Sequence, residues 1–150
     1  MQDTVNDFLD LAGDYDGFVF GTPVHFAAAA GEITSFLDRA FYADLNGGAN
    51  RFYLKPAAAV ISARRAGTTA TWDQINKYFG LMQMPIITSR YWNMVHGMDG
   101  KEAHLDIEGM QTMRNLAHNM AWLLKCIEAG KQQGIPLPAS ERGNRMNFIH

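Results

Sequence analysis

The stretch GFVFGTPVHFAAA, residues 17–29, decides the fold of this chain. Residues 17–20 form a continuous apolar run of strand length, and the run breaks off at Gly-Thr-Pro. A strand without polar alternation is typical of a parallel sheet that is covered on both faces. From about residue 28 the apolar residues follow a helical spacing. A buried strand that passes through a turn into an amphipathic helix predicts one unit of an alternating α/β fold.

The same alternation continues on both sides of this stretch. Helices are predicted over residues 1–12, from about 28 to 41, over 72–82 with Thr71 as N-cap, and from about 107 to 130. Further buried strands are predicted at 56–62 and 85–89, and residues 44–51 have the composition of a loop. The order α-β-α-β-α-β-α predicts right-handed crossovers and a parallel sheet between two helical layers.

Composition and charge narrow the class of protein. The 150 residues, 47% of them hydrophobic, fit one globular domain, with an extended tail predicted over 134–150. A net charge of −2 without a basic patch argues against nucleic acid as a partner. One cysteine, Cys126, excludes a disulfide or a cysteine-rich metal cluster, and it is expected to be buried and inert. Without a signal peptide or a membrane-length apolar run, we expect a cytoplasmic protein.

Three segments of the sequence resemble one family. GTPVHFAAAAGEITSFLDR (residues 21–39) is similar to the strand-loop-helix segment of flavodoxin-like NAD(P)H-dependent FMN reductases. SARRAGTTAT (62–71) resembles the Gly/Thr-rich loop of that family, and SRYWNMVHG (89–97) is similar to the closing part of its iron–sulfur-flavoprotein-type members. The resemblance covers nearly the whole chain. It implies a flavodoxin-like three-layer sandwich with a parallel sheet, FMN as cofactor and NAD(P)H as co-substrate.

The beginning of the chain departs from the family pattern. Members of the family start with a strand and a Ser/Thr/Asn-rich loop that grips the FMN phosphate, whereas residues 1–12 correspond to a helix that precedes the third family strand. The fold is therefore expected to be truncated at its N-terminus, with its first strand exposed as a sheet edge. Either a partner supplies the missing portion, the chain pairs its own edges, or the sequence is a fragment. FMN affinity would fall if the phosphate loop were truly absent.

The loops that follow strand ends are the expected ligand sites, because ligands of such sheets bind outside the carboxyl ends of the strands. The first of them, residues 21–26, offers a rigid proline, short side chains and a ring-sized apolar group, which suits a flavin edge. A plain strand-helix connection is the alternative. The cofactor-binding residues expected here are Thr22, Pro23, Val24, His25 and Phe26.

The loops at 63–69 and 90–97 complete the expected site. The second loop brings two guanidinium groups that could stabilise a reduced flavin or a nicotinamide phosphate, although solvated arginines at a turn are as good an interpretation. In the third loop the aromatic residues suit a core or an interface as well as a ligand wall. The expected cofactor contacts are Ala63, Arg64, Arg65, Ala66, Gly67, Trp92 and His96. No residue is assigned to acid–base catalysis, and His25, a lone histidine with no cysteine or carboxylate at metal-ligand spacing, predicts no metal site.

The leading hypothesis is an FMN-binding NAD(P)H-dependent oxidoreductase that passes electrons to a quinone, a flavin or a similar small acceptor. Hydride transfer to a bound flavin is the chemistry of the cofactor, and the protein positions and shields it. A homo-oligomer, dimer or tetramer, is the expected assembly, with neither nucleic acid nor membrane as a partner. The alternative is a degenerate, non-catalytic flavodoxin-like module that acts through oligomerisation. A nucleotide-binding response domain is weaker, because no acidic cluster follows the strands.

Overall fold

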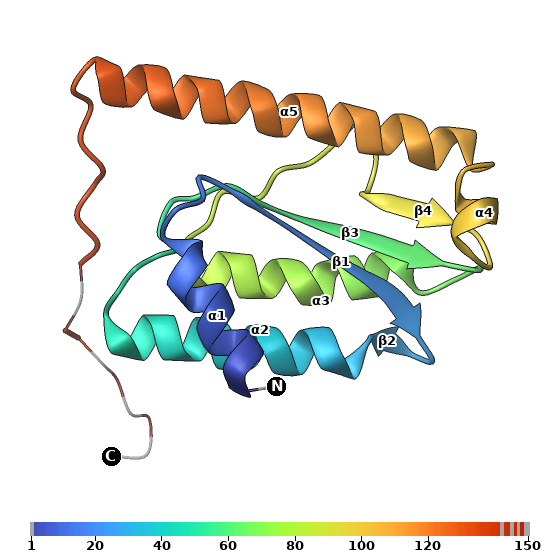
Figure 1. Ribbon diagram of the computed structural model, residues 1–150, viewed down its shortest axis with the longest axis horizontal. Helices are drawn as coiled ribbons and strands as arrows, with labels where there is room; N and C mark the ends of the chain where they lie inside the picture. The colour runs from blue at the N-terminus through green and yellow to red at the C-terminus, as the bar shows by residue number, and fades with distance from the viewer. Residues whose placement is uncertain (1, 142, 145, 147, 149–150) are drawn as a thin grey trace.

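The computed structural model describes residues 2–141, 143–144, 146 and 148. The elements in chain order are α1 (Gln2–Ala12), β1 (Phe18–His25), β2 (Ala28–Ala29), α2 (Gly31–Gly47), β3 (Ala57–Ala63), α3 (Thr68–Leu81), β4 (Met94–His96), α4 (Gly100–Ala103) and α5 (Ile107–Gln132). The sheet has the order β2-β1-β3-β4, with β1, β3 and β4 parallel and β2 antiparallel to β1. Helices α1, α2 and α3 lie on one face and α5 on the other (Figure 1), so the predicted α/β sandwich is confirmed.

Strand β1 is longer and more one-sided than the sequence predicts. It runs through Thr-Pro to His25 and then turns back in a short hairpin with β2. Phe18 and Phe20 are buried, but Val19 between them is 57% exposed. The prediction of burial on both faces is wrong at this strand. The reason is that α5 packs over Ala58 and Val60 of β3 and does not cover Val19 of β1.

The buried face of β1 opens onto an aromatic core. Six phenylalanine rings from α1, β1, α2 and the segment between α2 and β3 pack edge-on, tilted or stacked, with neighbouring centroids 4.8–6.3 Å apart. They are Phe8, Phe18, Phe20, Phe36, Phe41 and Phe52. Such ring pairs stabilise a core beyond the area that they bury. This face of the sheet therefore holds most of the apolar packing.

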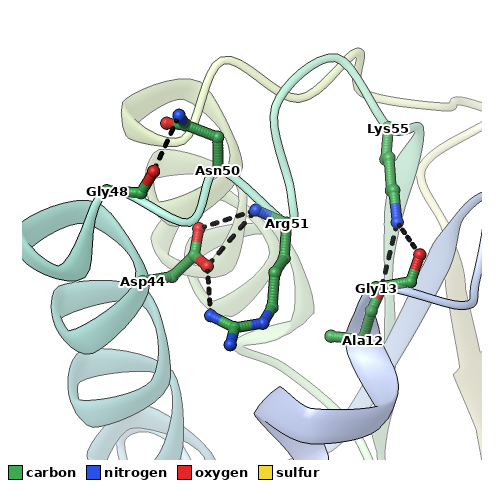
Figure 2. Close-up of polar contacts among 7 residues, drawn as sticks. All are labelled: Ala12, Gly13, Asp44, Gly48, Asn50, Arg51 and Lys55. Carbon is green, nitrogen blue, oxygen red and sulfur yellow. Dashed lines mark hydrogen bonds and ion pairs between the residues drawn. The ribbon is translucent and has the colours of Figure 1, made fainter.

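The connection from α2 to β3 is braced by a buried carboxylate. Asp44, 1% exposed, accepts hydrogen bonds from the backbone N–H of Arg51 to both carboxylate oxygens, at 3.1 and 3.2 Å (Figure 2). The Arg51 guanidinium adds an ion pair at 3.1 Å. Helix α2 ends at Gly47 and is capped by Gly48, which has a φ of 72°. The helix therefore extends into residues 44–47, which the sequence analysis assigned to a loop. A buried charge needs such pairing, so this turn is held in one conformation.

Lys55 ties α1 to the start of β3. Its ammonium group donates to the carbonyl oxygens of Ala12 and Gly13, each at 3.0 Å, at the C-terminal end of α1 (Figure 2). The pKa of Lys55 is lowered, mainly by burial. The nearby charge of Lys131 also lowers this pKa, whereas those of Asp16 and Asp14 raise it. A cation at a helix C-terminus satisfies carbonyls that have no partner within the helix. Helix α1 is thus fixed against the sheet by both apolar and polar contacts.

Two boundaries differ from the sequence-based prediction. Helix α3 begins at Thr68 after Gly67, whose φ of 101° suits only glycine, so Thr71 lies inside the helix and is not its N-cap. The strand predicted at 85–89 is reduced to an isolated bridge between Ile86 and Ala57, and the regular strand β4 forms further along. Neither change alters the sheet order. Both lie next to glycine or proline, where local preferences are weak guides to tertiary pairing.

The chain after α5 returns along the molecule without regular structure up to Glu141 (Figure 1). The Tyr53 hydroxyl donates to the Pro138 carbonyl at 2.9 Å, and Ser140 contacts Gln83. Cys126 on α5 is exposed, so the prediction of a buried thiol is wrong. Within the described residues, no helix has the length and apolar character needed to cross a membrane.

Candidate functional site

A cavity of about 370 Å³ lies at the carboxyl ends of β1 and β3. Short side chains and backbone from the strand ends form one wall, and the segment that leads into α4 forms the other. Its lining residues are Pro23, Val24, Ser62, Ala63, Arg64, Gly97, Met98, Asp99, Gly100 and Ala103. Ligand pockets of roughly 300–1,000 Å³ are usual, so this cavity suits a ring system better than a whole mononucleotide. It is at the sheet edge where the sequence places the site.

The β1 side of the cavity contains Pro23 and Val24, but the other residues expected from this loop point elsewhere. The Thr22 hydroxyl is buried, donates to the Pro23 carbonyl and accepts from the Ala30 N–H at 3.2 Å. Thr22 therefore links the hairpin to the start of α2. His25 and Phe26 are exposed at the hairpin turn, and Phe26 has a φ of 62°. Neither of them lines the cavity.

The β3 side contributes Ala63 and Arg64, whereas Arg65 and Ala66 lie exposed outside the cavity. Gly67 sits against its wall, since a Cβ at this position would lie 2.9 Å from a methyl carbon of Val24. This close approach brings the first turn of α3 beside Val24. The first N–H groups of a helix lack intrahelical partners, and no side chain caps α3. Their partial positive charge lies behind the β1 wall of the cavity.

The wall opposite the strand ends is a tightly packed segment after β4. The Gly97 N–H donates to the Ala63 carbonyl at 3.1 Å, and a Cβ on Gly97 would come within 2.5 Å of the Ala103 nitrogen. Only glycine lets α4 approach this closely. The Asp99 carboxylate caps α4 by accepting from the N–H groups of Lys101 and Glu102 at 2.8 and 2.9 Å. Its charge is therefore engaged in fixing the cavity wall.

His96 and Asp106 form a pair beside this wall, outside the cavity itself. Asp106, the N-cap of α5, accepts from the Gly109 N–H at 2.8 Å and from the His96 N–H at 2.7 Å, and its carboxylate lies 3.7 Å from His96 Nδ1. Burial alone would raise the pKa of Asp106, but the hydrogen bonds from Gly109 and His96 outweigh burial and lower it. The pair joins the end of β4 to the start of α5. It holds Gly97 and Met98 in position.

Trp92 lies on a different part of the molecule from the cavity. It packs edge-on against Tyr91, with ring centroids 4.6 Å apart, and both rings line a different cavity, together with Trp72 of α3. The structure thus brings together four of the twelve residues that the sequence suggests as cofactor contacts. They are Pro23, Val24, Ala63 and Arg64.

The sequence reasoning did not single out the residues that close the cavity after Gly97. The run Asp99-Gly100, followed by Lys-Glu-Ala, is a signal for a capped helix start, and it marks α4. Ser62 had no signal apart from its place at a strand end. Residues that line a site with backbone or with small side chains leave little trace in a single sequence.

Comparison with known proteins identifies the family. Residues 1–99 match the model of the NADPH-dependent FMN reductase family. The chain belongs to this family. An iron–sulfur flavoprotein of Methanocaldococcus jannaschii is 27% identical over 131 residues, which cover 84% of this chain and 67% of that protein. Membership gives FMN as the cofactor and NAD(P)H as its reductant, and it makes the chain a flavin-dependent NAD(P)H oxidoreductase.

Solved structures support the fold of this FMN reductase family member. The Trp repressor binding protein from Bacillus subtilis superposes with a TM-score of 0.61 at 14% identity, covering 80% of this chain and 70% of that one. An NADPH-quinone reductase from P. pentosaceus gives 0.54 at 13% identity, covering 79% and 73%. A WrbA-like flavodoxin from Agrobacterium tumefaciens gives 0.52 at 12% identity, covering 75% and 73%. The predicted flavodoxin-like fold is confirmed.

The residues of the cavity fit a flavin ring in part. Val24 and Ala63 offer apolar walls, and Arg64 is the one cation of the lining. A mononucleotide also carries a phosphate, and no second basic side chain lines the described cavity. The iron–sulfur part of the relative's name does not transfer to these residues, because a [4Fe–4S] cluster takes four cysteines and the sequence has one.

Proposed function

We propose that the cavity at the carboxyl ends of β1 and β3 holds the isoalloxazine ring of FMN, and that the protein reduces a quinone, a flavin or a similar small acceptor. The observation that carries this proposal is a ring-sized cavity at the strand ends where ligands of such sheets bind, in a chain of the FMN reductase family. When bound, FMN accepts a hydride from NAD(P)H and passes electrons on.

Each wall of the cavity has a distinct task in this proposal. Pro23 and Val24 cover the ring and exclude water, while the small side chain of Ala63 leaves space for a flat ligand. Arg64 supplies positive charge for the pyrimidine edge of a reduced flavin or for a phosphate of the nicotinamide. The start of α3 behind Val24 adds partial positive charge of the same sense. No side chain of the cavity is assigned to proton transfer.

The test is FMN binding to the purified protein, followed by the change of the flavin absorbance spectrum. FMN should bind at micromolar concentration, and NADPH should bleach the bound flavin without air. Val24→Trp fills the cavity and should abolish binding, whereas Arg64→Gln should weaken it about three- to tenfold. Arg114→Gln on the exposed side of α5 is the matched control. Unchanged FMN affinity in Val24→Trp would show that the ring binds elsewhere.

The open edge of β1 favours a second candidate, a module that acts by assembly. Among the described residues, β1 meets β2 only at Val24 and His25, so residues 18–23 have no strand on that side. Exposed edge strands favour pairing with another chain. Light scattering over a range of concentrations separates the candidates. An obligate oligomer without FMN affinity supports the module, and an FMN-binding species with NADPH oxidation supports the enzyme.

A further inference from the structure

Between the bridge at Ile86 and strand β4, the chain makes an excursion away from β3, over residues 88–93. None of these residues lines the proposed flavin cavity. Ala57 faces Ile86 and Ile61 faces Met94, so positions 57–61 of β3 lie opposite positions 86–94 of the next segment. The surplus residues cannot pair with β3. They loop outward between the bridge and β4 and carry Arg90, Tyr91 and Trp92 to the surface.

This excursion is fixed at both ends by hydrogen bonds. The side-chain amide of the fully buried Asn93 donates to the Ile87 carbonyl at 3.2 Å, and the backbone carbonyl of Asn93 accepts from the Ile61 N–H at 2.9 Å. Asn119 of α5 donates to the Thr88 carbonyl at 2.7 Å. The hydroxyl of Ser89 donates to the Tyr91 carbonyl within the loop. A surface loop held at so many points has a defined shape, which a binding site requires.

A cavity of about 350 Å³ lies between this excursion and α3, and its walls are mainly aromatic. It is lined by Trp72, Thr88, Ser89, Arg90, Tyr91 and Trp92. The indole N–H of Trp72 is buried and has no hydrogen-bond partner among the described residues. Because this N–H is enclosed, Trp72 contributes its ring to the cavity wall.

Arg90 gives the cavity its charge. Its side chain is exposed, and no hydrogen bond or ion pair from the described part of the chain engages its guanidinium group. Arginine stacks on aromatic faces and binds carboxylates through two parallel hydrogen bonds. Glu108 lines the adjoining hollow together with Arg90 and Tyr91, so a ligand with several negative charges would be repelled. The combination selects a flat ring system with a single anionic group.

We propose that this cavity is a second binding site, for a planar aromatic acid whose ring lies against Trp72, Tyr91 and Trp92 and whose acid group pairs with Arg90. The site is separate in its lining residues from the cavity at the strand ends. The proposal does not depend on the proposed flavin chemistry, because it concerns binding and includes no electron transfer.

The test follows the three indole N–H signals in a two-dimensional ¹H–¹⁵N NMR spectrum of the whole protein. The probes are 2-naphthoate, which is an anion at neutral pH, and 2-naphthalenemethanol, its neutral analogue. The signals of Trp72 and Trp92 should shift on addition of 2-naphthoate, while that of Trp122, which is exposed on α5 and does not line the cavity, should not. Saturating FMN should leave these shifts unchanged.

Variants separate the ring from the charge. Arg90→Gln should weaken 2-naphthoate binding about three- to tenfold and leave the neutral probe unaffected, whereas Trp92→Leu should weaken both probes. Both side chains are exposed enough for the fold to survive, which the rest of the spectrum checks. Arg114→Gln is the control for loss of one surface arginine.

Four outcomes would overturn the proposal. They are the absence of shifts at Trp72 and Trp92 up to about 5 mM probe, equal shifts at all three indoles, displacement of the probe by FMN, and equal affinity of Arg90→Gln and the parent for 2-naphthoate. Displacement by FMN would assign the cavity to the flavin site instead. Failure of FMN to bind at all would overturn the proposed function and leave this inference standing.

Discussion

The two faces of the sheet are built differently. On the face covered by α1, α2 and α3, phenylalanine rings from helices and strands interlock around Phe52, which is completely buried. On the face covered by α5, the cluster of buried apolar residues consists of Ala58, Ile87 and Leu116. Polar contacts at the helix start, where Asp106 holds both His96 and Gly109, supplement that smaller cluster. The face under α1, α2 and α3 is stabilised mainly by its aromatic core. The face under α5 depends more on the hydrogen bonds that fix the N-terminus of α5 to β4.

Truncation of Phe52 should have the largest effect on stability. Its ring stacks on or meets three other phenylalanine rings, so Phe52→Ala would leave a cavity that rigid neighbours cannot close. We expect a loss of about 3–5 kcal/mol in the free energy of unfolding. Urea denaturation followed by circular dichroism measures it. A loss below that of Leu116→Ala would contradict the comparison between the faces.

Leu116 is the matching position on the other face. It is 4% exposed and packs against Ala58 and Ile87, with fewer large neighbours that could be left unsupported. Leu116→Ala should cost about 2–3 kcal/mol, because α5 can settle toward the small alanine of β3. The same denaturation experiment applies, with Leu137→Ala, exposed in the tail, as a control near zero. An effect equal to that of Phe52→Ala would show that both faces are packed alike.

Substitution of Asp106 tests how strongly its hydrogen bonds fix the N-terminus of α5. Asp106→Asn should cost about 1 kcal/mol at pH 7, since a carboxylate at the helix start accepts two backbone N–H groups and favours the helix dipole. The pKa of Asp106 is lowered in the folded protein, so the contribution is present above the unfolded pKa and is lost as pH falls through the folded pKa. The difference between parent and variant should therefore shrink below about pH 4.

Unfolding curves at pH 7, 5 and 3 measure this difference. Asp99→Asn, which caps the short helix α4, is the matched control. A difference that grows toward low pH would contradict the assigned sign.

Val19 should give the smallest effect. It lies near the start of β1, on the face that α5 leaves open, and it is 57% exposed. Val19→Thr should change the free energy of unfolding by less than about 0.5 kcal/mol, because it keeps the β-branched shape and removes no enclosed contact. A loss above 1 kcal/mol would mean that Val19 is covered in solution, as it would be in an assembly through the β1 edge.

The spacing of apolar residues in the sequence predicted those features of the fold that depend on a regular pattern of burial. The alternation of apolar runs gave the helices, the first two parallel strands and the sheet edge where the cavity lies. It could not predict the exposure of Val19, because an apolar run reads the same whether one or two faces are covered. It also assigned a strand to 85–89, since Pro-Ile-Ile-Thr-Ser carries no sign that pairing with β3 breaks off after Ile87.

The sequence indicated the loops that form the candidate cavity better than the side chains that line it. Pro23 and Arg64, two of the residues suggested as cofactor contacts, line the cavity, while the neighbouring Thr22 turns its hydroxyl inward to fix the hairpin. Which side chain of a loop faces a cavity depends on the hairpin with β2 and on the approach of α4, and both are tertiary features. Gly97 illustrates this, because only the position of Ala103 explains why it must lack a side chain.

The course of the tail has a practical consequence for attaching this protein to other objects. Tyr53 and Gln83 hold the segment around Pro138 and Ser140 at the end of the sheet opposite to the cavity, as the ribbon shows (Figure 1). A dye, a bead or an electrode linker joined at Ser140 would therefore leave the carboxyl edge of the sheet open to small molecules in solution. Immobilisation through this tail orients the candidate site outward without any change in its walls.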